Sequence, residues 1–171
     1  ALYERLMERA KVELASCGQR GFLKLCQDTV DAFETLPVVD DRSKPRVGVV
    51  GEILVKFHPT ANNEVVRVIE QEGCEAVVPG LVDFFLFGMT SPMNMRGELG
   101  TKFRKRLTHQ TGIKVIEAMR EPINRMLEKS TRFEPYPDIY ELAAKAKQIL
   151  SLCNTMGEGW LLTAEMCDLI E

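Results

Sequence analysis

The stretch that decides the fold is RVGVVGEILVKFHPTANNEVVRVIEQEGCEAVVP, residues 46–79. Arg46–Val50 is short and rich in β-branched residues, which predicts a buried strand. Asn62 is a favourable N-cap for a helix, and Gly73 stands where a glycine typically ends one. Residues 74–79 predict a second strand. The order strand, helix, strand within about 34 residues is that of a βαβ unit, whose default form is parallel and right-handed.

Length and composition bound the class of protein. The chain has 171 residues, with 45% hydrophobic and 27% charged residues, which fits one ordinary globular domain. The net charge of −3 gives no support for a nucleic-acid partner or a membrane partner. Apolar runs are shorter than the ~20 residues of a membrane span, and the first residues do not form a signal peptide. The five dispersed cysteines predict free thiols in a reducing, cytoplasmic protein.

The chain divides into three segments of a single predicted domain. Residues 1–36 have the apolar spacing of a helical segment, which Gly18 and Gly21 are expected to divide into two helices or to kink. Residues 44–97 form the βαβ-like core. Residues 98–171 form a helical region that ends before further strands.

Local signals refine the second half of the chain. The apolar run after Pro79 predicts a short buried helix, and the stretch TSPMNMRGELG, residues 90–100, predicts a loop. Gly112 and Pro122 are expected to interrupt the helical pattern that follows, with Pro122 in the first turn of a new helix. Asp138 is expected to cap the next helix.

Only two strands are predicted, so a parallel sheet built from them has two unpaired edges. Together with the lack of a terminal cap, this predicts a fragment of a larger protein. The expected fold is α/β, an incomplete Rossmann-like parallel sheet with large helical additions. Unpaired strand edges also predict association into a homodimer.

Two motifs carry a resemblance to a known family. They are KPRVGVVGEILVKFHPTANNEVVRVIEQEGCEAVVPGLVDFF, residues 44–85, and GEGWLLTAEM, residues 157–166, about a third of the chain. Here the sequence resembles the C-terminal region of CoA-substrate-specific enzyme activases. These proteins are related to the 2-hydroxyacyl-CoA dehydratases and their activators.

The resemblance implies a Rossmann-like, dehydratase-type domain of a redox protein. In the wider family a kinase-like ATPase part hydrolyses ATP and passes a low-potential electron to an iron–sulfur protein. This sequence carries neither ATPase motifs nor an upstream set of cluster cysteines, and Cys74 stands where the family pattern has a small residue such as alanine. The resemblance therefore implies no cofactor in this segment, an iron–sulfur cluster in the full-length protein, and no catalysis by the segment alone. The implied partner is the remainder of the full-length chain or a dehydratase-type protein.

The loop after the first strand is the first candidate binding element. In α/β folds, strand carboxyl ends and helix amino ends collect ligands, and free amides favour anions. The residues expected to line this crevice are Gly51, Glu52, Lys56, His58, Asn62 and Asn63. A GxGxxG or Walker sequence is absent, so a polar crossover with a capped helix is the competing interpretation. If the loop binds a ligand, the alternative function is a Rossmann-like module for a small molecule, a nucleotide or an acyl-CoA.

The second candidate element is GEGW. Gly157 and Gly159 allow close approach of the backbone to a ligand, and Glu158 can hydrogen-bond a neighbouring loop. In the competing interpretation, Gly157 only ends the preceding helix. If both candidate elements lie at strand carboxyl ends, they face the same crevice.

A basic run, KFRKRLTHQ at residues 102–110, is consistent with a phosphate-rich ligand or, more commonly, with a solvated helix face. His58 and His109 are the only histidines, and neither has a partner at zinc-ligand spacing. No metal site and no catalytic residue are predicted from these residues.

Overall fold

The computed structural model describes residues 2–16, 18–37, 44–99 and 103–170, with all their side chains except those of residues 19, 93, 95–99 and 103–106. The chain forms two compact units. One consists of residues 41–116 and 137–171 and contains the sheet. The other consists of residues 1–40 and 117–136 and is helical.

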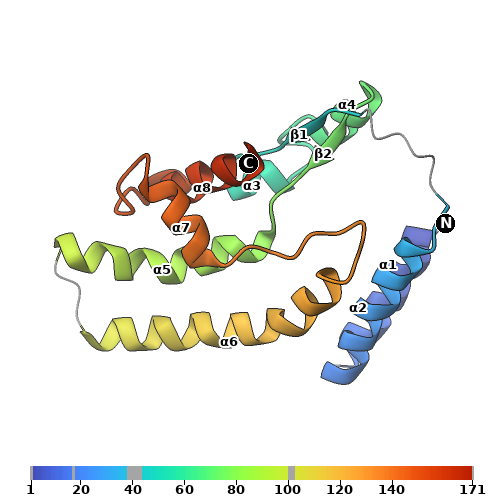
Figure 1. The fold of residues 1–171 in the computed structure, drawn as a ribbon, viewed down its shortest axis with the longest axis horizontal. Helices are drawn as coiled ribbons and strands as arrows, with labels where there is room; N and C mark the ends of the chain where they lie inside the picture. The colour runs from blue at the N-terminus through green and yellow to red at the C-terminus, as the bar shows by residue number, and fades with distance from the viewer. Residues whose placement is uncertain (1, 17, 38–43, 100–102, 171) are drawn as a thin grey trace. The chain divides into compact units, whose positions relative to one another are not determined.

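The unit with the sheet has nine elements in its described part (Figure 1). They are β1 (Arg46–Gly48), α3 (Ile53–Phe57), α4 (Val65–Gln71), β2 (Glu75–Val77), α5 (Leu81–Leu99), the first part of α6 (Phe103–Leu127), α7 (Ile139–Lys147), the 3-10 helix η1 (Met156–Glu158) and α8 (Gly159–Ile170). β1 and β2 pair in parallel, which confirms the predicted strand–helix–strand order. The described chain is therefore mostly helical, with a small parallel sheet and large helical additions.

The sheet is short and less buried than the sequence predicts. Val47 lies opposite Ala76, and the Val49 amide extends the ladder by donating to the Val77 carbonyl at 2.8 Å. All three residues of β1 are exposed, so the prediction of a buried strand is wrong. The β-branched residues favour a strand, but burial also needs elements over both faces. α8 approaches one point, where a Cβ on Gly48 would lie 2.7 Å from Leu169 Cδ1.

The crossover between the strands contains a helix within residues 51–63, where the sequence predicts a loop. This helix, α3, starts after Glu52, whose carboxylate accepts a hydrogen bond from the Leu54 amide at 3.1 Å. The N-cap position of α4 belongs to Glu64 and not to Asn62, so that prediction is wrong. Asn62 still supplies a cap oxygen, because its Oδ1 accepts from the Val65 amide at 3.3 Å.

Gly73 ends α4 as predicted. Its φ of +83° lies in the left-handed region, where a side chain would be strained. The Gly73 amide donates to the Glu70 carbonyl, and the Cys74 amide donates to the Ile69 carbonyl, both at 3.1 Å. This pattern satisfies carbonyls that the helix end leaves open and turns the chain into β2.

Two helices run through residues that predict interruptions. α5 includes Pro92 and extends to Leu99, so the predicted loop at residues 90–100 is wrong. α6 is continuous through Gly112 and Pro122, so neither residue ends it and Pro122 does not start a new helix. At Gly112 the reason is close packing. A Cβ there would lie 2.9 Å from Met89 Sδ of α5, so tertiary packing favours a glycine in α6 despite its low helix propensity.

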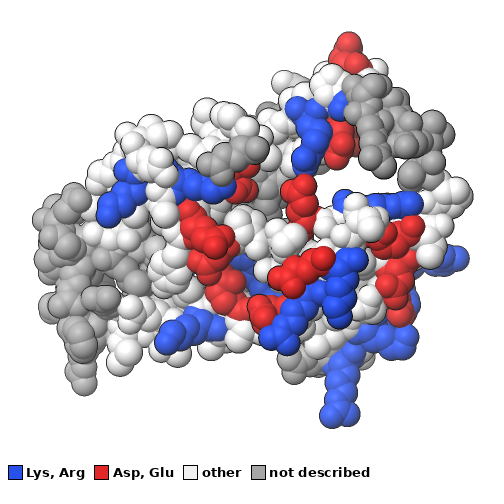
Figure 2. Space-filling view, viewed as in Figure 1, with Lys and Arg blue, Asp and Glu red and all other residues white. Residues whose placement is uncertain are grey.

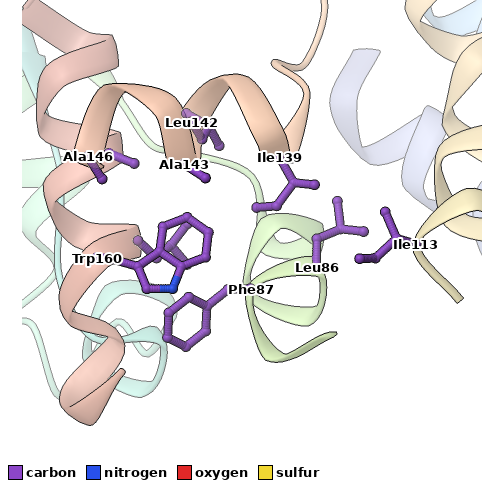
Figure 3. Packing of buried hydrophobic residues seen from close by; sticks show 10 residues of the cluster. Leu86, Phe87, Ile113, Ile139, Leu142, Ala143, Ala146 and Trp160 are labelled. Carbon is purple, nitrogen blue, oxygen red and sulfur yellow. The ribbon is translucent and has the colours of Figure 1, made fainter. Parts of the chain in front are cut away.

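The hydrophobic core of this unit lies among α5, α6, α7 and α8 (Figure 3). Trp160 is fully buried, its ring lies 5.0 Å from that of Phe87, and its indole Nε1 donates to Ser91 Oγ at 3.3 Å. The remaining buried members are Leu86, Ile113, Ile139, Leu142, Ala143, Ala146, Leu161 and Ala164. Burial of this apolar surface is the main force that holds α8, and with it the GEGW motif, in place.

The start of α7 confirms a local prediction. Asp138 is its N-cap, and the Asp138 carboxylate accepts from the Tyr140 amide at 2.7 Å. The helix ends at Lys147, and the turn that follows leads into η1 and α8. At the join, the Trp160 amide donates to the Asn154 carbonyl at 2.9 Å.

The helical unit is built on α1 (Leu2–Ala15) and α2 (Gln19–Glu34), which pack against each other. Gly18 is the N-cap of α2, which confirms a break there, whereas Gly21 lies inside α2 and does not interrupt it. Arg9 of α1 pairs with Asp28 of α2 at 2.7 Å. The same unit contains the end of α6 and the segment that follows it, residues 117–136.

Glu34, the last residue of α2, is held by the turn after α6. The Thr131 amide and the Thr131 hydroxyl each donate to its carboxylate at 2.8 Å, and the Ser130 hydroxyl also donates to it. These hydrogen bonds lower the pKa of Glu34 from 4.5 to about 2, and the one from Ser130 has the largest effect. A carboxyl group with a depressed folded-state pKa stabilises the fold above its unfolded pKa.

We therefore expect an acid-dependent loss of stability that Glu34 causes. As pH falls from 4.5 to about 2, the stabilisation from the Glu34 carboxylate is lost on protonation. In Glu34→Gln this part of the pH dependence should be absent. Urea unfolding across that pH range measures it, and parallel pH profiles for the two proteins would contradict the assignment.

Candidate functional site

A deeply buried ion pair joins the two sequence motifs. Lys56 Nζ of α3 donates to Glu165 of α8, at 2.7 Å to Oε1 and 3.0 Å to Oε2. The two side chains are 3% and 2% exposed. Charges removed from water to this degree need close, hydrogen-bonded partners, and this geometry supplies both.

Glu158 makes the second connection. Its Oε1 accepts a hydrogen bond from the Ile53 amide at 3.1 Å, although 105 residues separate the two in sequence. Ile53 is the first residue of α3, so the carboxylate satisfies one of the amides that a helix leaves open at its start. The predicted proximity of the two candidate elements is therefore observed for the Glu158 side chain.

The backbone of the GEGW motif is unusual where it makes this contact. Gly157 and Glu158 have φ values of 59° and 61°. Glycine adopts this left-handed region freely, but a glutamate there costs on the order of 1–2 kcal/mol. The contacts of the buried Glu158 side chain offset that cost, and such strain is typical of functional segments.

The site is rich in acidic groups. Asp83 of α5 is 2% exposed, and its charge and that of Glu158 both act on Glu165. Burial is the largest cause that raises the pKa of Glu165, and the hydrogen bond and charge of Lys56 oppose it. Glu165 of α8 thus interacts with one buried lysine from α3 and with two buried carboxyl groups, from α5 and η1.

The other predicted residues of the first element have mainly local partners. Glu52 caps α3, as described above. The ring Nδ1 of His58 accepts from the Ala61 amide at 3.2 Å. Asn62 Nδ2 donates to the carbonyls of Val55 and Lys56 at 3.0 and 3.1 Å. These contacts shape the crossover, which supports the competing interpretation for these three residues.

The remaining predicted residues are distinguished by their backbone conformation or by the space around them. Gly51 has no heavy atom within 4 Å of the place where its Cβ would be. Asn63 is exposed and has a φ of 55°. A Cβ on Gly159 would lie 2.6 Å from Asn154 Oδ1, so a glycine is required there by packing. The buried polar cluster consists of Lys56, Asp83, Glu158 and Glu165. Of the predicted residues, only Lys56 and Glu158 belong to it.

A pocket of about 500 Å³ opens beside this cluster. It lies along the end of α3, the crossover and α4, and it reaches the residue that follows β2. Its lining residues are Lys56, Phe57, Pro59, Asn62, Glu64, Val66, Arg67, Glu70 and Val78. The volume is within the usual range for small-molecule sites. Of its two cations, Lys56 pairs with Glu165, and Arg67 pairs with Glu64 at 2.8 Å.

The predicted basic run falls mostly outside the described side chains. Lys102 and the side chains of Arg104, Lys105 and Arg106 lie outside the described part of the chain. On the face shown in Figure 2, the described Lys and Arg side chains lie among Asp and Glu side chains.

Sequence reasoning missed Glu165 and Asp83. Asp83 is the single acidic residue of the apolar run GLVDFFLFG, and Glu165 is one of two acidic residues in the mostly apolar run GWLLTAEMCDLI. On an amphipathic helix an acidic residue usually faces solvent, so its presence in the helix does not by itself predict burial. The available signal is the free-energy cost of burying a carboxylate on an otherwise apolar helix face. Because that cost must be offset, it predicts a hydrogen-bonding partner inside the protein.

Comparisons with known proteins add no assignment. The chain matches no protein-family model, no curated protein and no solved structure. Among the described helices, none is both long and apolar enough to cross a membrane.

The Glu158 contact leads to a testable expectation. In Glu158→Ala the Ile53 amide loses its acceptor, and we expect a loss of about 1–3 kcal/mol in the free energy of unfolding. Glu158→Gln keeps an acceptor oxygen and removes a charge near Glu165, so its loss should be smaller. Urea unfolding of both variants measures the difference. Equal losses in the two variants would contradict a hydrogen-bonding role for this side chain.

Proposed function

We propose that this chain forms the Rossmann-like part of an activase- or 2-hydroxyacyl-CoA dehydratase-related redox protein. In the intact protein it contributes to an iron–sulfur cluster or partner site, and it is not catalytic alone. The observation that carries the proposal is the hydrogen bond from the Ile53 amide to Glu158. It joins the two motifs on which the family resemblance rests. Two motifs far apart in sequence are thus parts of one structural unit.

The parallel pair of strands supports the Rossmann-like part of the proposal. β1 and β2 are connected through α3 and α4 and pair in parallel. In open α/β sheets, ligands bind outside the carboxyl ends of the strands. Lys56 follows β1 and Asp83 follows β2 along the chain, and the charges of both act on Glu165, which supports a polar site near that end of the sheet.

The described residues do not fit a complete cluster site. Among them, no group of three or more His, Cys, Asp or Glu side chains is arranged to hold a metal ion. Among the described residues, Cys26, Cys74, Cys153 and Cys167 are not joined in disulfides, and Cys17 lies outside the described residues. In the proposal, cluster ligands therefore come from elsewhere in the redox protein, and no electron-transfer step is assigned to these side chains.

Anaerobic purification of the natural protein that contains this sequence tests the proposal. We expect iron and acid-labile sulfide in about equal amounts, as in common iron–sulfur clusters. On reduction, the electron paramagnetic resonance signal should change in Glu158→Gln. It should not change in the control Glu121→Gln, since Glu121 is exposed and pairs with Arg125 on its own helix. Absence of iron and sulfide after anaerobic reconstitution would contradict the redox proposal.

The pocket of about 500 Å³ favours a second candidate function, a module that binds a nucleotide or an acyl-CoA. Thermal unfolding in the presence of ATP, ADP and acetyl-CoA tests it. We expect a rise in Tm with at least one ligand, and loss of that rise in Val66→Trp, which places a larger side chain in the pocket. If none of the three ligands raises the Tm, this second candidate is wrong.

A further inference from the structure

The turn at residues 130–132 surrounds the Glu34 carboxylate with donors from several directions. The Thr131 and Arg132 amides donate to Oε1 at 2.8 and 3.3 Å. The Thr131 hydroxyl donates to Oε2 at 2.8 Å, and the Ser130 hydroxyl donates to Oε1. Two backbone amides and two hydroxyls within three consecutive residues thus converge on one anionic group.

The turn is organised around this acceptor. While Ser130 Oγ donates to Glu34, the same oxygen accepts from the Arg132 amide at 3.0 Å and the Phe133 amide at 2.9 Å. The Arg132 guanidinium donates to the Phe33 carbonyl, beside Glu34. The Phe33 and Phe133 rings also meet edge to face, with centroids 5.8 Å apart.

Glu34 is poorly placed for the helix that carries it. It is the last residue of α2, and the carboxyl end of a helix disfavours negative charge. The donors of the turn outweigh this effect, since they lower the pKa of Glu34 to about 2. The stabilisation of the charge therefore comes from the turn and not from α2.

We infer that the turn Ser130–Arg132 is an oxyanion-binding site that Glu34 occupies from within the same chain. Closely spaced backbone amides and hydroxyls bind carboxylate and phosphate groups alike, because both offer several acceptor oxygens. A free oxyanion can take the place of the Glu34 carboxylate, and the contact between α2 and the turn is then released. The site is independent of the proposed redox function.

Phosphate titration of Glu34→Ala, followed through backbone amide resonances, tests the inference. We expect saturable shifts at Thr131 and Arg132. Binding to the native chain should be at least about tenfold weaker, because Glu34 competes for the site. Chloride at equal ionic strength should not reproduce the shifts, and acetate should, since the site recognises oxyanions of either kind. In Glu34→Ala with Thr131→Val, which lacks a hydroxyl donor, phosphate binding should weaken at least about tenfold.

Glu34→Gln provides a second variant if the alanine variant does not fold. Its amide fills the same space without charge, so we expect phosphate affinity between those of the native chain and Glu34→Ala. Binding in both Glu34 variants that is no stronger than in the native chain would overturn the inference. So would shifts that chloride reproduces. Either result would leave the turn as a structural contact for Glu34 alone.

Discussion

Lys56→Met should lower the free energy of unfolding by about 3–5 kcal/mol near neutral pH, because Glu165 is left charged and buried without its partner. The loss should shrink under mildly acidic conditions. Burial already raises the pKa of Glu165, and removal of Lys56 removes the two effects that oppose this rise. The folded variant then binds a proton more strongly than the unfolded chain, so its stability increases as pH falls through the raised pKa.

Urea unfolding at about pH 7.5 and about pH 5 measures both parts of this expectation. Lys11→Met is the matched control, since Lys11 is exposed and pairs with Glu8 on its own helix. Exposed pairs of this kind contribute about 0–1 kcal/mol, so the control should remain close to the native chain at both pH values. A loss in Lys56→Met that is as small as in the control would show that the pair is not buried.

Trp160→Ala should cost about 3–5 kcal/mol, the usual range for removing a large aromatic side chain from a core. The substitution leaves a cavity beside Phe87 and removes the indole hydrogen bond to Ser91. Because Trp160 lies in the first turn of α8, we expect the contacts of Glu158 and Glu165 to weaken as well. The core and the polar cluster should therefore be lost together.

Far-UV circular dichroism during urea unfolding is the suitable measurement, since Trp160 is the only tryptophan and its fluorescence is lost in the variant. Met156→Ala is the control, because Met156 is 86% exposed. It should change stability by no more than about 0.5 kcal/mol. A Trp160→Ala protein as stable as this control would show that α8 is not anchored by the core.

Local chemistry was sufficient to predict the elements whose signals lie within a few residues. The parallel strands follow from two β-branched runs with a helix between them. The Asp138 cap and the Gly73 helix end follow from side-chain oxygen and backbone freedom. None of these features requires a contact between distant parts of the chain.

Predictions failed where distant contacts decide the structure. α5 continues through Pro92, and α6 continues through Pro122, although each proline removes a backbone donor. Lys56 was a candidate from its loop, but its partner Glu165 is 109 residues away on an apolar helix. From the sequence one can infer that burying such a charge costs free energy. The sequence does not show which distant residue offsets that cost.

The most direct test of the account is whether the two motifs form one energetic unit. A double-mutant cycle of Lys56→Met and Glu165→Met, measured by urea unfolding near neutral pH, isolates their interaction. We predict a coupling free energy of at least about 2 kcal/mol, with the double variant close to the native chain because two apolar side chains replace the buried pair. Losses that add to within about 0.5 kcal/mol would contradict the central claim that α3 and α8 meet through this pair.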